Sequence, residues 1–349
     1  MPVLLFLLYL PQTYSLFIMK ASITKYAILL IACGGIFFYQ SCKKDKDPIK
    51  HKLGLFPETL VNLYDLNNTL DISDFSKHVI QGDIAIVFST PDNQLALKQG
   101  AISYVFDQTT GDFSSAFGST NDGFIQNLIN KATGQGYNIG AYRFFCTIDG
   151  FEYFMLSSEN AAGNSDFYYL RNIPMFGTNY PEIQGPLPIT LLNSAANDAY
   201  ICFDQDFDTA YFSSDRDGNF DIYVHSFSLE KPLNDQLNQP FIASAKPDSI
   251  NSSADDMCPF IHKNVMVFAS DRPGGLGGFD LYYSIFRNGK WSSPINFGPD
   301  INTEFDEYMP VLGSVTDFKN SYLLFSSDRN GSNFELYFTG INLSNLSRQ

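Results

Sequence analysis

Four oxygen-bearing side chains alternate along the short segment DRDGNFD, at Asp215, Asp217, Asn219 and Asp221. Carboxylate and amide oxygens are the ligands that Ca²⁺ prefers, which makes this segment a candidate calcium loop. An EF-hand loop, however, needs glycine at its sixth position and glutamate at its twelfth, whereas glycine is fourth here. Two similar segments, DRPGGLGGFD and DRNGSNFE, carry proline or asparagine in place of Asp217. The pattern therefore favours a structural turn over a metal site.

All three segments begin with an Asp-Arg pair and end with a second acidic residue. A guanidinium group binds a carboxylate through two parallel hydrogen bonds, so an arginine here can fix the geometry of a hairpin. We expect each arginine to pair with the second acid of its own turn or with the next unit. The residues of these predicted structural turns are Asp215, Arg216 and Asp221, then Asp271, Arg272 and Asp280, and finally Asp328, Arg329 and Glu335.

Three cysteines also recur at a constant interval of 56 residues. Thiols on the innermost strands of neighbouring units could together bind a soft metal. Cysteine is also among the most buried residues and often acts as a small hydrophobe. Because the inner strands of neighbouring blades diverge, the second interpretation is favoured, and we expect neither a metal nor a cofactor. The three residues are Cys146, Cys202 and Cys258.

The turns belong to a longer repeat. Aligned on the acid that follows each apolar strand, Glu159, Asp215, Asp271 and Asp328 are 56, 56 and 57 residues apart, and a fainter copy, IAIVFSTPDN, precedes them. Each unit holds an apolar stretch, two strands that flank the turn, and a further strand in the linker. The chain contains 33 Phe and 20 Tyr, which favour β-structure. Four short antiparallel strands per unit predict an all-β fold, a β-propeller of four-stranded blades.

The SSDRxGxxDIY unit resembles the TolB-type, WD-like propeller repeat of bacterial envelope proteins, over most of residues 55–343. At this repeat length we expect five blades, with six as the alternative if residues 91–159 contain a degenerate unit. The last unit lacks a fourth strand. The segment FPETLVNLYDLNNTLD near the N-terminus is similar to the fourth-strand segment SSPINFGPDINTEFD. We therefore expect it to pair with the last blade and close the ring, which leaves no long strand edge exposed.

The N-terminal part of the chain predicts a targeting segment. From Met19, which we expect to be the true start, a basic stretch leads into an apolar run at 26–39 that is too short to span a bilayer comfortably. The SCKK sequence that follows is similar to the lipidation site of bacterial lipoproteins, so Cys42 is the expected lipidated residue, with Cys33 as the alternative. The expected division is a signal peptide over 1–42, a tether over 43–54 and the propeller over 55–349.

The propeller is strongly acidic. Residues 53–349 contain 15 Lys and Arg against 35 Asp and Glu, a balance that repels nucleic acid. Acidic linkers enter the first strand of each unit, and antiparallel order places them at the same end of the ring as the Asp-Arg turns. Grouped carboxylates suit a basic partner, or a hard cation bound by oxygen ligands. The candidate binding face consists of Asp198, Asp255, Asp256, Glu304, Asp306 and Glu307.

Catalytic motifs are absent from the sequence: it has no His-Glu-x-x-His, no Gly-x-Ser-x-Gly and no phosphate-binding loop. We therefore expect a lipoprotein of the outer membrane, facing the periplasm or the surface, that binds an envelope protein or polymer without chemistry and meets the membrane only through its lipid. The alternative is a propeller hydrolase acting on glycans or peptides. That alternative predicts two carboxylates about 5–9 Å apart in the channel, one of them with a raised pKa.

Overall fold

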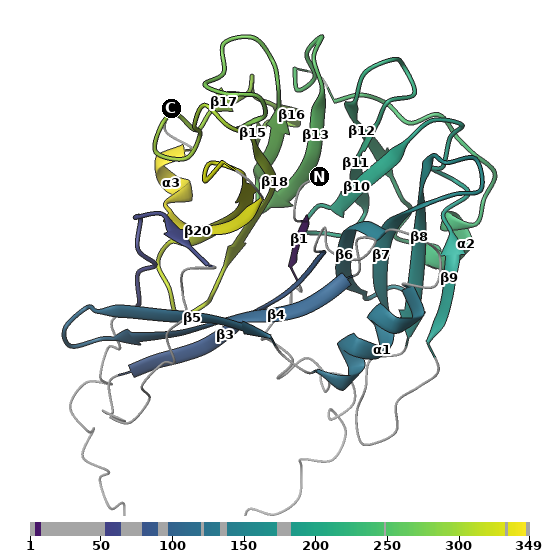
Figure 1. Cartoon of the computed structure of the whole chain (residues 1–349). Coiled ribbons are helices and arrows are strands. Elements are labelled where there is room, and N and C mark those ends of the chain that lie inside the picture. The colour runs from purple at the N-terminus through teal and green to yellow at the C-terminus, as the bar shows by residue number, and fades with distance from the viewer. Residues whose placement is uncertain are drawn as a thin grey trace, which may run out of the picture.

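The strands form five antiparallel sheets arranged around a central axis as a β-propeller (Figure 1). This computed structural model confirms the expected fold class and the expected five blades. The sheets are numbered here as blades 1 to 5 in chain order. The structure describes residues 4–7, 53–63, 79–89, 97–119, 122–132, 138–172, 183–247, 249–331 and 334–346.

Blades 2, 3 and 4 are continuous hairpin stacks that begin with the innermost strand, whereas blades 1 and 5 each include a strand from the N-terminal part of the chain. Blade 1 contains β1 (Leu4–Leu7), β3 (Val79–Ser89), β4 (Leu97–Asp107) and β5 (Phe113–Ser119). Blade 2 contains β6 (Asn138–Cys146), β7 (Phe151–Glu159), β8 (Ser165–Asn172) and β9 (Gln184–Pro188). Blade 3 contains β10 (Asp198–Phe203), β11 (Thr209–Ser214) and β12 (Asp221–Ser226), with a single bridge from Val224 to Ala245 in place of a full fourth strand.

The last two blades follow the same plan. Blade 4 contains β13 (Asp256–His262), β14 (Val265–Ser270), β15 (Asp280–Arg287), and the short β16 (Lys290–Trp291) and β17 (Ile295–Asn296). Blade 5 contains β18 (Glu307–Ser314), β19 (Ser321–Ser327), β20 (Glu335–Ile341) and β2 (Val61–Asn62). Outside the sheets, the described residues form three helices: α1 (Gly123–Ala132), α2 (Leu233–Leu237) and α3 (Leu343–Leu346).

Aromatic side chains fill the space between neighbouring blades. Phe167 of blade 2 meets Phe212 of blade 3 edge to face, with ring centroids 5.4 Å apart. Tyr211 of blade 3 meets Trp291 of blade 4 in the same way at 5.8 Å. Sheets that radiate from an axis leave wedge-shaped gaps between them, and the large rings of aromatic side chains fill such gaps. This packing accounts for the Phe- and Tyr-rich composition.

The ring is closed by the segment that the sequence predicted. Strand β2 pairs antiparallel with β20, so the fourth strand of the last blade comes from the N-terminal side of the chain. Asn62 lies opposite Tyr337 in blade 5, and Asn296 lies opposite Tyr282 in blade 4. The two fourth strands therefore share one register, and the closure of the ring by the N-terminal strand is confirmed.

The targeting residues fall almost entirely outside the described part of the chain. Met19, Cys33 and Cys42 are not described, so the signal peptide and the lipidation site remain predictions. Of residues 1–52 the structure describes only β1, which pairs with β3 in blade 1. Within the described ranges, no helix has the length and apolar character needed to cross a membrane.

Candidate functional site

The channel is lined by the innermost strands β6, β10, β13 and β18, and each of them carries a β-bulge at the same depth. A bulge leaves one residue out of the ladder and turns its side chain toward a new direction. The bulged residues have positive φ, which costs a residue with a side chain about 1–2 kcal/mol. They are Gly140 (67°), Tyr200 (60°), Cys258 (56°) and Met309 (54°).

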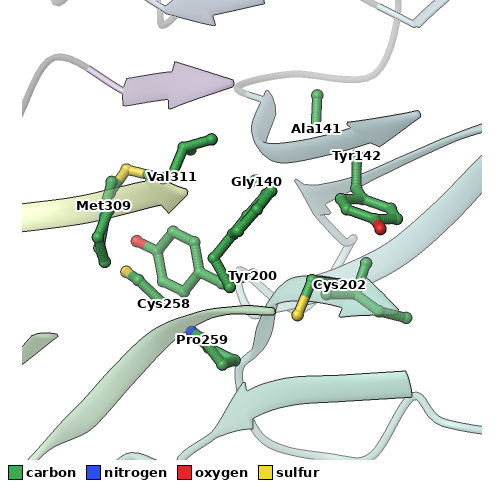
Figure 2. Close-up of a pocket in the computed structure, with 12 residues that line it drawn as sticks. Gly140, Ala141, Tyr142, Tyr200, Cys202, Cys258, Pro259, Met309 and Val311 are labelled. Carbon is green, nitrogen blue, oxygen red and sulfur yellow. The ribbon is translucent and has the colours of Figure 1, made fainter. Parts of the chain in front are cut away.

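The bulged residues surround a small cavity on the channel (Figure 2). Its volume is about 40 Å³, which holds a few water molecules at most. Glycine is needed at position 140, because a Cβ atom there would lie 3.1 Å from Cα of Tyr200. The lining is aromatic, apolar or sulfur-containing and includes no carboxylate. Nothing in the sequence repeat signals these bulges, because the four residues differ in type.

The three cysteines lie on innermost strands of adjacent blades, as predicted, and their thiols are buried. They do not lie at one depth. Cys146 follows the first residue of β6 by eight positions, whereas Cys202 follows that of β10 by four and Cys258 that of β13 by two. The hairpins after these strands differ in length, which offsets the constant sequence interval. Burial raises the pKa of all three thiols. Among the described residues, no three His, Cys, Asp or Glu side chains gather as metal ligands.

The arginines of the Asp-Arg turns bind different carboxylates from those predicted. Each one pairs with the acid that begins the innermost strand of its own blade, and not with the second acid of its turn. Both acids lie opposite the serine that ends the second strand, one on each side of it. The arginine reaches the acid on the innermost side, where it also donates to a backbone carbonyl of the linker that enters the blade. The observed ion pairs are Arg216 with Asp198, Arg272 with Asp256 and Arg329 with Glu307.

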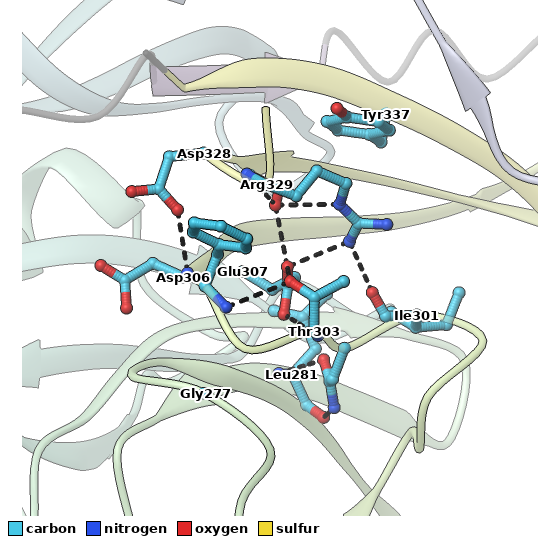
Figure 3. Close-up of polar contacts among 12 residues, drawn as sticks. Gly277, Leu281, Ile301, Thr303, Asp306, Glu307, Asp328, Arg329 and Tyr337 are labelled. Carbon is cyan, nitrogen blue, oxygen red and sulfur yellow. Dashed lines mark hydrogen bonds and ion pairs between the residues drawn. The ribbon is translucent and has the colours of Figure 1, made fainter. Parts of the chain in front are cut away.

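Blade 5 shows the whole arrangement (Figure 3). Nη2 of Arg329 donates to Oε1 of Glu307 at 3.0 Å and to the carbonyl of Ile301 at 2.6 Å, and Nε donates to Oγ of Ser327 at 3.0 Å. The guanidinium lies 4.5 Å from the ring centroid of Tyr337. Burial raises the pKa of Glu307, against hydrogen bonds and the arginine charge that lower it. The arginine is thus clamped inside the blade.

Three of the six residues of the predicted acidic face therefore do not lie on the surface. Asp198, Asp256 and Glu307 are completely buried in these ion pairs and cannot meet a partner. The prediction that they form a binding surface is wrong, because the carboxylate that begins each innermost strand pairs with the arginine of the same blade.

The other three acids of the predicted face lie nearer the surface, but two of them are also structural. Asp255 accepts the backbone N–H of Phe220 at 2.8 Å, and Asp306 accepts that of Phe279 at 2.8 Å, each from the preceding blade. These contacts tie neighbouring blades together. Only Glu304 of the six is exposed.

The first acid of each turn also serves the backbone. Asp215, Asp271 and Asp328 each accept an N–H from the linker that enters the same blade, at 2.7, 2.8 and 2.9 Å. These donors are the backbone amides of Asn197, Asp255 and Asp306. The interpretation of the repeated acids as structural turn residues agrees with this geometry, although the partners are amides of a neighbouring loop.

The second acid of each turn holds the fourth strand. Asp221 binds Nζ of Lys246 at 2.6 Å, Asp280 accepts from Asn296 at 2.7 Å, and Glu335 accepts from Asn62 at 2.6 Å. These acids were predicted to pair with arginine. Their actual role is to fasten the outermost strand, and Asn62 does this for the strand that closes the ring.

The candidate calcium loop contains a lysine ammonium. Nζ of Lys246 lies 2.8 Å from Oδ2 of Asp217 as well as 2.6 Å from Asp221, and the hydroxyl of Tyr223 donates to Asp217 at 2.8 Å. The hydrogen bond from Lys246 lowers the pKa of Asp217. A cation of the protein itself therefore occupies the position that a metal ion would need.

Comparisons with known proteins add little to this picture. No protein-family model matches the chain, and no curated protein sequence matches it. Among solved structures, it is similar to a thermostable family-43 glycoside hydrolase at 12% identity and a TM-score of 0.45, covering 75% of this chain and 86% of that one.

Two further solved structures are similar in the same way. A putative TolB from Agrobacterium tumefaciens shares 12% identity with a TM-score of 0.35, covering 78% of this chain and 79% of that one. An endo-1,4-beta-xylanase from Bacteroides thetaiotaomicron shares 11% identity with a TM-score of 0.42, covering 74% of this chain and 88% of that one. Likenesses of this strength do not decide between a binding protein and a hydrolase.

Proposed function

We propose that this protein is a TolB-like propeller lipoprotein of the bacterial outer membrane, anchored through Cys42, that binds an envelope protein or polymer without catalysing a reaction. The observation that supports the proposal is that the repeated charged residues hold the scaffold together. The arginines and most of the acids of the repeat are engaged in the scaffold, as buried ion pairs or as acceptors of backbone amides. Residues engaged in this way are not available for acid-base chemistry.

The size of the channel cavity supports the same conclusion. Sites for small ligands usually enclose about 300–1,000 Å³. The described cavity measures about 40 Å³ and its lining includes no carboxylate, so a sugar ring does not fit between two acids there. We expect a partner to meet the loops of the ring, because binding residues are concentrated on loops that a rigid scaffold positions.

A glycan- or peptide-cleaving hydrolase is the second candidate, and one observation favours it. Burial and the neighbouring carboxylate of Asp208 raise the pKa of Asp204 to about 6. A carboxyl group with a raised pKa beside a second acid is a pattern of general acid catalysis. Asp204 lies in the hairpin between β10 and β11, however, where it also accepts the backbone amides of Asp208 and Thr209 at 3.3 Å. An Asp turn in a hairpin explains the same geometry.

Two experiments test the proposal. Cell fractionation with a radiolabelled fatty acid should place the wild-type protein and a Cys33→Ala variant in the outer membrane with label. A Cys42→Ala variant should lose the label and leave the membrane. Purified propeller should capture specific partners from envelope extracts after cross-linking. Release of sugar or peptide from a panel of envelope polymers, abolished by Asp204→Asn, would replace the binding function by the hydrolase.

A further inference from the structure

Four blades offer the same pair of residues on the third strand, an acid followed two positions later by a tyrosine. In blades 3, 4 and 5 the acid is held by a donor from the fourth strand, as described above. In blades 4 and 5 that donor lies directly opposite the tyrosine, and in blade 3 the ammonium of Lys246 lies 5.3 Å from the ring centroid of Tyr223. The position opposite the tyrosine therefore supplies the partner of the acid.

Blade 2 breaks this pattern. Asp166 lies opposite Ser158, as Asp221 lies opposite Ser214 in blade 3, and Tyr168 follows it in the position of Tyr223. The residue opposite Tyr168 is Pro188, which has neither a side-chain donor nor a backbone N–H. Oδ1 of Asp166 is buried and has no hydrogen-bond partner in the structure as described. A buried carboxylate oxygen without a donor costs free energy that a partner can recover.

Blade 3 shows which chemistry fits this position. There a lysine ammonium binds the equivalent carboxylate at 2.6 Å beside the equivalent ring. The side chain of Lys246 remains 36% exposed, so in blade 3 this position borders on solvent. In blade 2 the neighbouring surface is formed by Leu187, which is 37% exposed, and by the exposed Pro188. Such apolar surface suits the methylene stem of a lysine.

We propose that Asp166 and Tyr168 bind a lysine side chain of a basic protein partner, which takes the place that Lys246 occupies within blade 3. This inference rests on the proposed binding function and names the chemistry of its partner. The charge balance favours it, since residues 53–349 carry 15 Lys and Arg against 35 Asp and Glu. Burial raises the pKa of Asp166 and the charge of Asp198 raises it further, whereas a hydrogen bond with the side chain of Asn160 lowers it. An incoming ammonium at Oδ1 would relieve the unfavourable environment that remains.

A lysine hexapeptide is the probe for this site, titrated into the full chain by calorimetry at low salt. Asp166→Asn should weaken binding about tenfold, because a charge-assisted hydrogen bond is lost. Glu304→Gln removes the same charge from an exposed position in blade 5 and should change binding less than twofold. The acetylated peptide should not bind. Equal weakening by the two variants would mean nonspecific attraction to an acidic protein, and an unchanged affinity in Asp166→Asn would also overturn the proposal.

A second variant tests the same geometry by filling the site. Pro188→Lys supplies an ammonium in cis, as blade 3 does, and should abolish binding of the peptide while raising Tm. The envelope capture experiment distinguishes failure of the lysine site from failure of the proposed binding function. If Asp166→Asn recovers the same partners as the wild type, the lysine site fails and the binding function stands. If the wild type recovers no partner, the binding function fails whatever the peptide shows.

Discussion

Removal of one clamped arginine is the sharpest test of the scaffold. In blade 4, Nη2 of Arg272 donates to Asp256 and to the carbonyl of Ile250 at 2.8 Å, and Nε donates to Ser270 at 3.0 Å. Its guanidinium lies 4.9 Å from the ring centroid of Tyr282. The substitution Arg272→Met keeps an unbranched apolar stem and removes the guanidinium with its charge and donors.

The substitution lowers the free energy of unfolding because the carboxylate of Asp256 loses its partner. Asp256 is completely buried, and after the substitution its carboxylate keeps only the donors of Ser252, at 2.5 and 2.9 Å. Stranding one member of a buried ion pair typically costs about 3–5 kcal/mol. For a domain of this size we expect Tm to fall by about 6–12 °C. An exposed ion pair would cost about 0–1 kcal/mol, which separates the two cases clearly.

Urea unfolding followed by circular dichroism measures the change, with Lys290→Met as a matched control for an exposed cation in the same blade. A loss below 1 kcal/mol would refute the clamped arrangement. The double variant Arg272→Met with Asp256→Asn removes the stranded charge and should recover much of the loss. If the double variant is as unstable as the single one, the lost packing against Tyr282, and not the buried charge, sets the cost.

Three further outcomes follow from the described contacts. Asn62→Ala removes the donor to Glu335 in the closing strand and should lower stability in urea by about 1–2 kcal/mol, whereas Thr59→Ala beside it should be neutral. Burial lowers the pKa of His262 to about 4, below its unfolded value near 6.5, so stability should fall by up to about 3 kcal/mol as pH drops from 6.5 to 4. His262→Gln should flatten that slope in pH-dependent melts. Finally, mass spectrometry after brief alkylation of the native protein should find no label on the buried thiols Cys146, Cys202 and Cys258, and full label after unfolding.

The architecture was predictable because it depends on periodicity. The recurring turn acids at Glu159, Asp215, Asp271 and Asp328 mark the end of the second strand in blades 2 to 5, and an interval of about 56 residues leaves room for four short strands. Ring closure was predictable for the same reason, since the closing segment copies the fourth-strand sequence. Blade 1 lacks the Asp-Arg turn, and its strands were recognised only as a faint copy.

The partners of the charged residues were not predictable from the repeat. A repeat shows that Arg216 and Asp221 recur together, but it does not show which carboxylate the guanidinium reaches. Strand register does not decide this, because Asp198 and Asp221 both lie opposite Ser214. The guanidinium of Arg216 reaches Asp198 and a linker carbonyl, whereas Asp221 binds Lys246. Recurrence within a turn was therefore mistaken for contact within a turn.

The channel residues were missed for a different reason. The bulges of the innermost strands place Tyr200, Cys258 and Met309 at equivalent points, although no residue type is shared among them. The hairpins that follow the innermost strands differ in length, and this difference shifts the cysteines relative to one another. Neither effect leaves a pattern in a single sequence, because backbone geometry and not side-chain chemistry is repeated there.

In a repeat protein, then, the residues that recur are the ones that build the scaffold. The arginine clamp, the fastened fourth strand and the bonds between blades account for nearly all of the repeated charges here. A specific binding function has to be sought where one unit departs from the others, because the departure is not needed for folding. Two of the departures in blade 2 bear on Asp166: asparagine replaces the arginine at position 160 and forms a hydrogen bond with Asp166, and Pro188 replaces the donor of the fourth strand. The second departure leaves a buried carboxylate oxygen of Asp166 without a donor, which a purely structural unit would have no reason to keep.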